Sequence, residues 1–191
     1  DICLSSDDNE IINVSAELGL KTIYKRPKKL ALDSTGKIET INHALLFFEK
    51  YFEKKYDFIL DLDVTSPLRT INDLTLAFNK LINSTNALNI FSVNNCNRNP
   101  YFNMVEINNN GFYSLAKNGS FLTRQSAPKV YDMNASFYFY RRKYFDMNIK
   151  SSISDKSLIY VMPHICFDLD NPLDFDFMDY LISSNKLNFK F

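Results

Sequence analysis

The sequence predicts an α/β fold in which helices flank a mostly parallel sheet. Apolar residues recur at helical spacing over residues 37–54. The short apolar run at 57–62 (DFILDL) has the length of a buried strand. Another helix is expected over about 71–82, where Thr70 and Asp73 have the spacing of a capping box. Strand and helix therefore alternate, which is typical of parallel sheets.

The start of the chain adds two short strands and one helix to this pattern. Residues 2–5 and 22–24 are predicted strands. The polar residues 6–8 can cap the helix between them, which is expected to run to about Leu18 and to stop at Gly19.

The second half of the chain is richer in strands. The residues at 108–111 (NNNG) form a good hairpin turn, because Asn and Gly tolerate positive φ. Asn171 and Pro172 begin a last helix, which is expected to reach about Ser184. The predicted strands are 91–93, 102–107, 112–115, 135–140 and 158–162.

Composition limits the classes of function. The 191 residues suit a single domain, and 46% are hydrophobic, which is too many for a disordered chain. Lys plus Arg equals Asp plus Glu at 22 each, so no net charge attracts nucleic acid or an anionic membrane. Three cysteines without metal-ligand spacing favour the reducing cytoplasm. The longest apolar runs, such as 44–48, are too short to span a bilayer.

The first candidate site is the segment 62–69 (LDVTSPLR). It follows a predicted strand, where ligands of open α/β sheets bind. Its hydroxyls, its backbone amides and the Arg69 guanidinium suit an anionic or sugar ligand. The alternative is an ordinary helix entry with capping hydroxyls and a solvated arginine, and spacing alone favours that alternative.

The second candidate is the pair Asp168 and Asp170. Two carboxylates separated by one residue after a strand can hold Mg²⁺ through oxygen. The alternative is an acidic helix start, where negative charge is favourable without any ligand. An Asp-x-Asp pair is a weak signal by itself.

The third candidate lies between Arg124 and Tyr138. Arg124, Asn134 and Tyr138 could together bind a carboxylate and sugar hydroxyls, but an ordinary loop and strand edge explain them equally well. The two histidines, His43 and His164, are interpreted as packed or solvated side chains rather than catalysts.

Six segments, taken in order, resemble the acylneuraminate cytidylyltransferase family. They are residues 1–8 (DICLSSDD), Arg26-Pro27 with Leu30-Ala31 and Asp33, His43-Ala44-Leu45, Thr65-Ser66-Pro67-Leu68-Arg69, Arg124-Gln125 with Pro128, Asn134 and Tyr138, and Asp168-Leu169-Asp170 with Leu173-Asp174. Each segment is weak evidence alone. Six in the family's order favour the functional interpretation of all three candidates.

The resemblance implies a Rossmann-like nucleotide-diphospho-sugar transferase fold over residues 1–191, with a small β-rich dimerisation insert at about 100–131. It implies Mg²⁺-dependent transfer of CMP from CTP to the anomeric hydroxyl of an acidic nine-carbon sugar, a nonulosonic acid, by a homodimer. Asp168 and Asp170 would hold the metal and act in catalysis. Arg26 and Asp33 would contact the nucleotide. The residues implied for the sugar are Asp63, Ser66, Arg69, Arg124, Gln125, Asn134 and Tyr138.

Departures from the family pattern leave alternatives open. The family's first strand and glycine-rich triphosphate loop have no counterpart, so this chain alone is expected to be inactive. Ala135 replaces the family's glycine and Asp132 replaces a cationic residue, so the sugar could be of the sialic, legionaminic or pseudaminic type. A catalytically degenerate ligand-binding or assembly remnant, and a 3-deoxy-manno-octulosonate cytidylyltransferase, are the competing interpretations. The general base is not evident.

Overall fold

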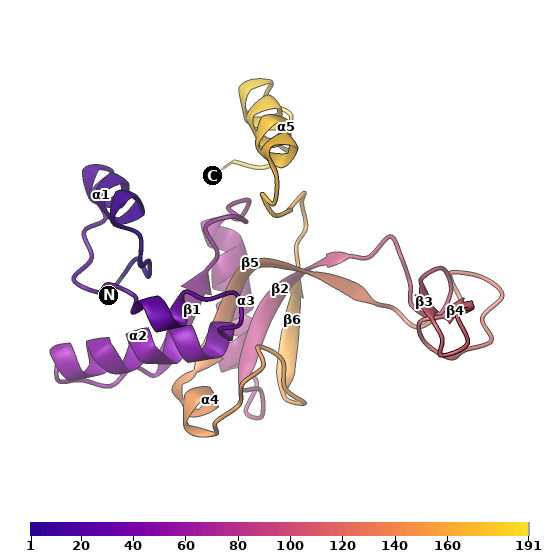
Figure 1. The fold of residues 1–191 in the computed structure, drawn as a ribbon, viewed down its shortest axis with the longest axis horizontal. Helices are drawn as coiled ribbons and strands as arrows, with labels where there is room; N and C mark the ends of the chain where they lie inside the picture. The colour runs from indigo at the N-terminus through magenta and orange to yellow at the C-terminus, as the bar shows by residue number, and fades with distance from the viewer. Residues whose placement is uncertain (191) are drawn as a thin grey trace. The chain divides into compact units, whose positions relative to one another are not determined.

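The computed structural model describes residues 1–190 (Figure 1). The elements are α1 (Asn9–Glu17), the 3-10 helix η1 (Lys28–Leu30), α2 (Lys37–Tyr51), β1 (Phe58–Leu62), α3 (Ile71–Ile82), β2 (Asn89–Asn95), β3 (Val105–Ile107), β4 (Tyr113–Leu115), β5 (Tyr131–Arg141), α4 (Arg142–Asp146), β6 (Ser157–Val161) and α5 (Pro172–Ser183). The predicted alternation of helix and strand is therefore present from α2 to β2.

A four-stranded sheet has the order β1-β5-β2-β6. The Asp63 amide donates to Ser136 at 3.3 Å, and the Arg142 amide donates to Asp57 at 2.9 Å, so β5 runs antiparallel to β1. The chain leaves β2, traverses residues 96–130 and returns beside β2 as β5. That return makes β5 the reversed strand of the sheet.

The other pairing at the sheet edge is parallel. The Leu88 amide donates to Lys156, and the Met162 amide donates to Val93, each at 2.9 Å. The residue numbers increase together, so β2 and β6 run in the same direction. The Arg141 amide donates to Leu88 O at 2.9 Å and the Phe137 amide to Ser92 Oγ at 3.1 Å, so β5 also runs opposite to β2. Three of the four strands therefore share one direction, and the sheet is mixed because β5 lies reversed between β1 and β2.

The two strands predicted at the start of the chain are absent from the structure. Residues 2–5 and 22–24 are assigned to no helix or strand. The Thr22 hydroxyl donates to Leu4 O at 3.1 Å, and the Arg26 amide donates to Ser6 O at 2.9 Å. These isolated bonds hold the segments together without the repeated backbone pairing that defines a strand.

Local sequence signals explain where several helices begin. The Asp8 carboxylate accepts from two amides of the first turn of α1. Thr70 and Asp73 form the predicted capping box at the start of α3. Asn171 and Asp174 form another at α5. The short helices η1 and α4 were not predicted from the sequence.

The chain divides into two compact units, each made of three segments. The first unit is Asp1–Asp61, Phe78–Ile90 and Tyr138–Leu158, and the second is Leu62–Ala77, Phe91–Phe137 and Ile159–Phe191. Tyr24, Phe48 and Tyr140 are buried in the first unit, and Phe137 and Leu68 in the second. The single domain over 1–191 with an insert at about 100–131 stays a prediction.

Strands β3 and β4 form a separate two-stranded ribbon in the second unit (Figure 1). Val105 pairs with Leu115, and Ile107 pairs with Tyr113. The predicted hairpin turn is confirmed, with Gly111 at φ 80°. The ribbon lies within the predicted insert.

Candidate functional site

The turn that follows β1 is held by Arg69. Its Nη1 donates to the carbonyl oxygens of Asp63 at 3.0 Å, Ser66 at 2.7 Å and Ser136 at 2.9 Å. The Asp63 carboxylate accepts from the hydroxyl of Thr65 at 3.1 Å, which closes a local turn. Arg69 therefore organises the turn and ties it to β5, in addition to any contact with a ligand.

Ser66 is buried beneath this turn. Its hydroxyl donates to Asn134 O at 2.7 Å and lies 3.4 Å from Phe167 O. The Cys166 sulfur is 3.7 Å away, and burial raises the pKa of this thiol. The bonds of Ser66 join the turn to β5 and to the segment that carries Asp168.

The Asn134 side chain continues the same buried network. Its Oδ1 accepts from Ser92 at 2.6 Å, and its Nδ2 donates to Asn94 Oδ1 at 2.9 Å. Asn94 in turn donates to Cys166 O at 2.6 Å. A buried polar group must be paired, so this network fixes β2, β5 and the segment after β6 in one arrangement.

Asp168 and Asp170 lie on the segment between β6 and α5. The Leu169 amide donates to Thr65 O at 2.8 Å, which places the pair beside the predicted turn. Asp168 is half-buried with its Oδ1 atom buried, and Asp170 is exposed. The structure thus brings the first two candidate segments together.

The donor set of this pair fits Mg²⁺. Magnesium is usually held by one or two carboxylates together with water and substrate phosphates. Asp168 and Asp170 supply two carboxylates, and among residues 1–190 no cluster of three or more His, Cys, Asp or Glu side chains forms an all-protein metal site. The pair therefore suits a metal that arrives with a phosphate ligand.

A second buried network lies at the start of α3 and was missed in the sequence. Asp73 Oδ2 accepts from Thr70 N at 2.7 Å and lies 2.9 Å from His164 Nε2, while Oδ1 accepts from Tyr160 at 3.0 Å. Burial raises the pKa of Asp73, but the hydrogen bonds from Thr70, His164 and Tyr160 outweigh it and lower the pKa. Burial and the Asp73 contact raise the pKa of Tyr160 to about 12. The Thr70-Asp73 spacing was the sole sequence signal.

Arg124 and Gln125 line a cavity of about 350 Å³ in the second unit. Arg98 and Lys129 also line it and give it cationic character, and neither was predicted. Asn134, a predicted sugar contact, does not line this cavity and is buried in the network described above. The residues lining the cavity are Asn95, Cys96, Asn97, Arg98, Asn99, Arg124, Gln125, Ala127, Pro128, Lys129, Val130 and Tyr131.

An acidic group stands next to this cationic cavity. The Cys96 thiol donates to Asp132 Oδ1 at 2.9 Å. Burial, followed by the Asp132 hydrogen bond, raises the pKa of Cys96, so the thiol stays protonated at neutral pH. The Asp132 carboxylate is therefore held next to the cavity by its bond to Cys96, which lines it.

Three predicted site residues belong to the first unit. Arg26 donates from Nε to Ser5 Oγ at 3.1 Å and from Nη2 to Ser5 O at 2.5 Å. Asp33 is exposed, and Tyr138 is 4% exposed. The Lys37 ammonium lies 4.4 Å from the centroid of the Tyr138 ring, so this tyrosine packs against a cation.

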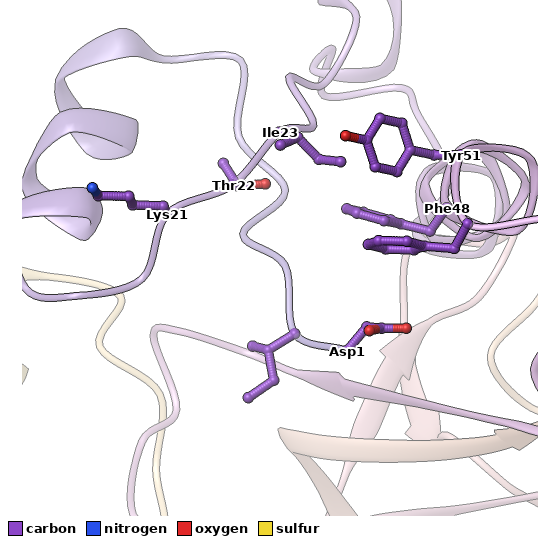
Figure 2. Close-up of a pocket in the computed structure, with 8 residues that line it drawn as sticks. Asp1, Lys21, Thr22, Ile23, Phe48 and Tyr51 are labelled. Carbon is purple, nitrogen blue, oxygen red and sulfur yellow. The ribbon is translucent and has the colours of Figure 1, made fainter.

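The first unit also has a cavity of about 280 Å³ that contains none of the predicted residues. The rings of Phe48 and Tyr51 project from α2 toward Thr22 and Ile23, while Lys21 points away (Figure 2). The walls of this cavity are mainly apolar, and Asp1 and Lys21 are its charged residues.

Comparison with known proteins gives several relatives that match nearly the whole of this chain and about four fifths of their own length. CMP-N,N'-diacetyllegionaminic acid synthase of Campylobacter jejuni is 38% identical over 98% of this chain and 79% of that protein. Post-translational flagellin modification protein B of Campylobacter coli is 36% identical over 99% of this chain and 80% of that protein. A pseudaminic acid cytidylyltransferase of C. jejuni is 27% identical over 97% of this chain and 79% of that protein. No family profile matches the chain.

The solved structure of CMP:2-keto-3-deoxy-manno-octonic acid synthetase complexed with CTP is similar in fold. It covers 97% of this chain and 81% of that one, with a TM-score of 0.63 and 12% identity. This likeness confirms the α/β, Rossmann-like class. The sequence identities define the family more narrowly: the chain belongs to the acylneuraminate cytidylyltransferases, the cytidylyltransferases of nonulosonic acids. Within residues 1–190, no helix has the length and apolar character that crossing a bilayer requires.

Proposed function

We propose that the protein transfers CMP from CTP to the anomeric hydroxyl of a nonulosonic acid and releases pyrophosphate. The observation that carries this proposal is the position of Asp168 and Asp170 beside the 65–69 turn. The Leu169–Thr65 bond and the buried bonds of Ser66 maintain that position. A backbone anchored next to both carboxylates favours the fixed geometry that a metal-assisted phosphoryl transfer needs.

We assign a role in this reaction to each of the predicted site residues. Bound Mg²⁺ would neutralise phosphate charge and orient the α-phosphorus. Asp168 and Asp170 would hold that ion. Arg26 and Asp33 are the proposed nucleotide contacts, and the proposed sugar contacts are Asp63, Ser66, Arg69, Arg124, Gln125, Asn134 and Tyr138. Burial of Ser66 and Asn134 favours an indirect contribution, through the turn and β5, over direct contact with the sugar.

The cationic cavity supports an acidic sugar as the acceptor. Arg98, Arg124 and Lys129 face one cavity of about 350 Å³ together with several amides. A guanidinium can bind a carboxylate through two parallel hydrogen bonds, and amides can pair with hydroxyl and acylamido groups. The named relatives act on legionaminic and pseudaminic acids, which favours these classes over the eight-carbon acid of the structural neighbour.

The proposal is tested by measuring pyrophosphate release and the CMP-sugar product with CTP, Mg²⁺ and each of three acids: N,N'-diacetyllegionaminic, pseudaminic and 3-deoxy-manno-octulosonic acid. Asp170→Asn should abolish Mg²⁺-dependent turnover and leave the circular dichroism spectrum unchanged. Asp179→Asn on α5 is the matched control, because Asp179 is an exposed aspartate outside the pair. Near-normal turnover in Asp170→Asn would remove this residue from the metal site.

The same assay decides among the competing interpretations. Product from the eight-carbon acid alone would favour a 3-deoxy-manno-octulosonate cytidylyltransferase. Specific sugar binding without turnover, in the longest natural form of the protein, would favour a degenerate remnant. The expectation that residues 1–191 alone are inactive stays a prediction. A homodimer and a cytoplasmic location are likewise proposed.

A further inference from the structure

The network at the start of α3 has more partners than a helix cap needs. A capping box is complete with Thr70 and Asp73. Here the Asp73 side chain is 1% exposed and also contacts Tyr160 and His164. A buried carboxylate is costly unless each oxygen is paired, so the extra partners stabilise its charged form.

His164 connects this carboxylate to the segment that carries the proposed metal ligands. It lies between the end of β6 at Val161 and Asp168. Its Nε2 is 2.9 Å from Asp73 Oδ2, and its Nδ1 is 3.0 Å from Ile165 O. The ring is thereby held at both nitrogens, one by α3 and one by its own segment.

The C-terminal segment covers the other side of the imidazole. The ring of Phe189 stacks on His164 with centroids 3.8 Å apart and planes at 24°. As a result the His164 side chain is only 5% exposed. A ring enclosed in this way cannot touch a substrate, so its contribution has to act through the segment to which it belongs.

We propose that His164, anchored on Asp73, is a positioning residue that sets the geometry of Asp168 and Asp170 for the metal. The inference rests on the proposed function, because it assumes that these two carboxylates bind Mg²⁺. The Met162 amide, which donates to Val93 O, continues the β2–β6 pairing by one residue, and attachments at Cys166, Phe167 and Leu169 belong to the turn network. His164 is the side-chain attachment between these two groups, and it ties the segment to α3 as the segment leaves the sheet.

Tyr160 provides a matched control for this role. It donates to the same Asp73 carboxylate but lies within β6, outside the segment that carries the ligands. Tyr160→Phe therefore weakens the buried network without freeing the segment. His164→Leu removes the anchor, whereas His164→Gln keeps an amide donor at a similar reach.

The experiment measures binding of Mn²⁺, used as a probe for the same hard oxygen site, by electron paramagnetic resonance in the presence of CTP. It also measures hydrogen exchange at the Leu169 amide without ligand. His164→Leu should weaken Mn²⁺ binding by about 10- to 100-fold, the usual range for a residue that supports metal ligands, and should accelerate exchange at Leu169. His164→Gln should restore most of the affinity. Tyr160→Phe should lower the melting temperature and leave both readouts at wild-type values.

If His164→Leu folds poorly, Asp73→Asn tests the same contact by changing the partner of His164. It should reproduce the loss of Mn²⁺ affinity, and Asp73→Asn/His164→Leu should be no worse than either single change. The inference would be overturned if His164→Leu and Asp73→Asn both bound Mn²⁺ like the wild type while Asp168→Asn still abolished binding. Failure of the wild-type protein to bind Mn²⁺, or no effect of Asp168→Asn, would overturn the proposed metal site and this inference with it.

Discussion

Single polar residues in this chain serve two purposes that the sequence cannot separate. Ser66, Arg69 and Asn134 have the residue types of sugar ligands, yet the structure uses them to pair backbone and side-chain groups inside the second unit. A hydroxyl, a guanidinium and an amide are suited to both tasks. We therefore expect these residues to contribute to substrate binding indirectly, by holding the turn in place.

Arg124 is the residue whose exposure and cavity fit a direct ligand contact. Arg124→Lys should raise the KM of the sugar about tenfold or more and leave the KM of CTP nearly unchanged, because a lysine cannot form the paired bonds of a guanidinium. Steady-state kinetics with each substrate varied in turn measures both constants. Lys129→Arg, which keeps a cation in the same cavity, is the control. An effect confined to CTP would assign Arg124 to the nucleotide.

Ala135 has a backbone conformation that suits glycine. Its φ is 53°, a left-handed value within β5, where the family has glycine after the asparagine. A left-handed conformation destabilises an L-residue by about 1–2 kcal/mol, whereas glycine avoids this cost but loses about 0.5–1 kcal/mol more in conformational entropy on folding. We expect Ala135→Gly to raise the free energy of unfolding by about 0.5–1 kcal/mol in urea titrations.

A β-branched residue should have the opposite effect at the same position. Ala135→Val is expected to cost about 2 kcal/mol or more, because a branched side chain in this region is strongly disfavoured. If Ala135→Gly is less stable than the wild type, the positive φ is not a source of strain in β5.

Among the elements, α2 and α4 are joined by a buried ion pair. Glu49 accepts from Arg142 Nε at 2.7 Å and from Nη2 at 3.2 Å, and the Glu49 side chain is 3% exposed. The Arg142 hydrogen bond, aided by Lys55, lowers the pKa of Glu49 from 4.5 to about 2, against the effect of burial. This carboxylate therefore stabilises the fold while it is ionised.

The pH dependence of stability follows from the direction of this shift. A carboxyl with a lowered folded-state pKa contributes fully above 4.5, and the contribution is lost as the pH falls toward about 2. Glu49→Gln should therefore be less stable by about 2 kcal/mol at pH 7, after allowance for solvent screening near Lys55. The difference from wild type should shrink as the pH falls from 4.5.

Urea titrations between pH 3 and pH 7 make this measurement. Asp146→Asn is the control, because Asp146 contacts the same arginine but its side chain is 59% exposed. Its cost should stay below about 0.5 kcal/mol. Equal destabilisation by the two substitutions at pH 7 would contradict a special role for the buried pair.

Elements were predictable where a local pattern is sufficient. Helix α3 has the predicted bounds because its capping box and apolar spacing act within a few residues. The segments 2–5 and 22–24 have the composition of strands, but a strand also needs a partner with a continuous ladder. The antiparallel direction of β5 depends on the path of residues 96–130, which is a tertiary property.

The candidate site was likewise predictable only where a pattern along the chain was sufficient. The order of segments along the chain favoured a functional interpretation of the 65–69 turn and of Asp168 and Asp170 separately, and their roles stay predictions. That the two segments lie together is seen only in the structure, through the Leu169–Thr65 bond. The His164–Asp73 contact joins residues 91 positions apart, and neither has a sequence motif that points to the other. Arg98 was missed for the same reason, since its place beside Arg124 depends on how the insert folds back.

At the scale of the whole molecule, charge is balanced in sum and concentrated locally. The 22 basic and 22 acidic residues cancel, yet Arg98, Arg124 and Lys129 share one cavity and Asp168 and Asp170 share one segment. Such an arrangement suits ligands that are small and highly charged, because fields from clustered charges act over roughly one Debye length of about 8 Å at physiological salt.

The β3–β4 ribbon has one apolar face and one polar face. Val105, Ile107, Tyr113 and Leu115 are paired across the ribbon and therefore share a face, while Glu106 and Ser114 form the other. Val105 and Ile107 are each 63% exposed. A two-stranded ribbon is only marginally stable alone and needs a surface to cover it. We propose that a second copy of the protein supplies this surface, in the homodimer that is itself a proposal.

The wild-type protein should accordingly be a dimer at micromolar concentration in light scattering coupled to size exclusion. Val105→Glu/Ile107→Glu should shift it to monomer, because two buried carboxylates would lose their hydration without gaining partners. Glu106→Gln, on the polar face of the same strand, should leave the dimer intact. Circular dichroism would establish that each variant stays folded, since the ribbon is separate from the four-stranded sheet. A monomeric wild type, or a dimer that survives both glutamates, would place the interface elsewhere or remove it.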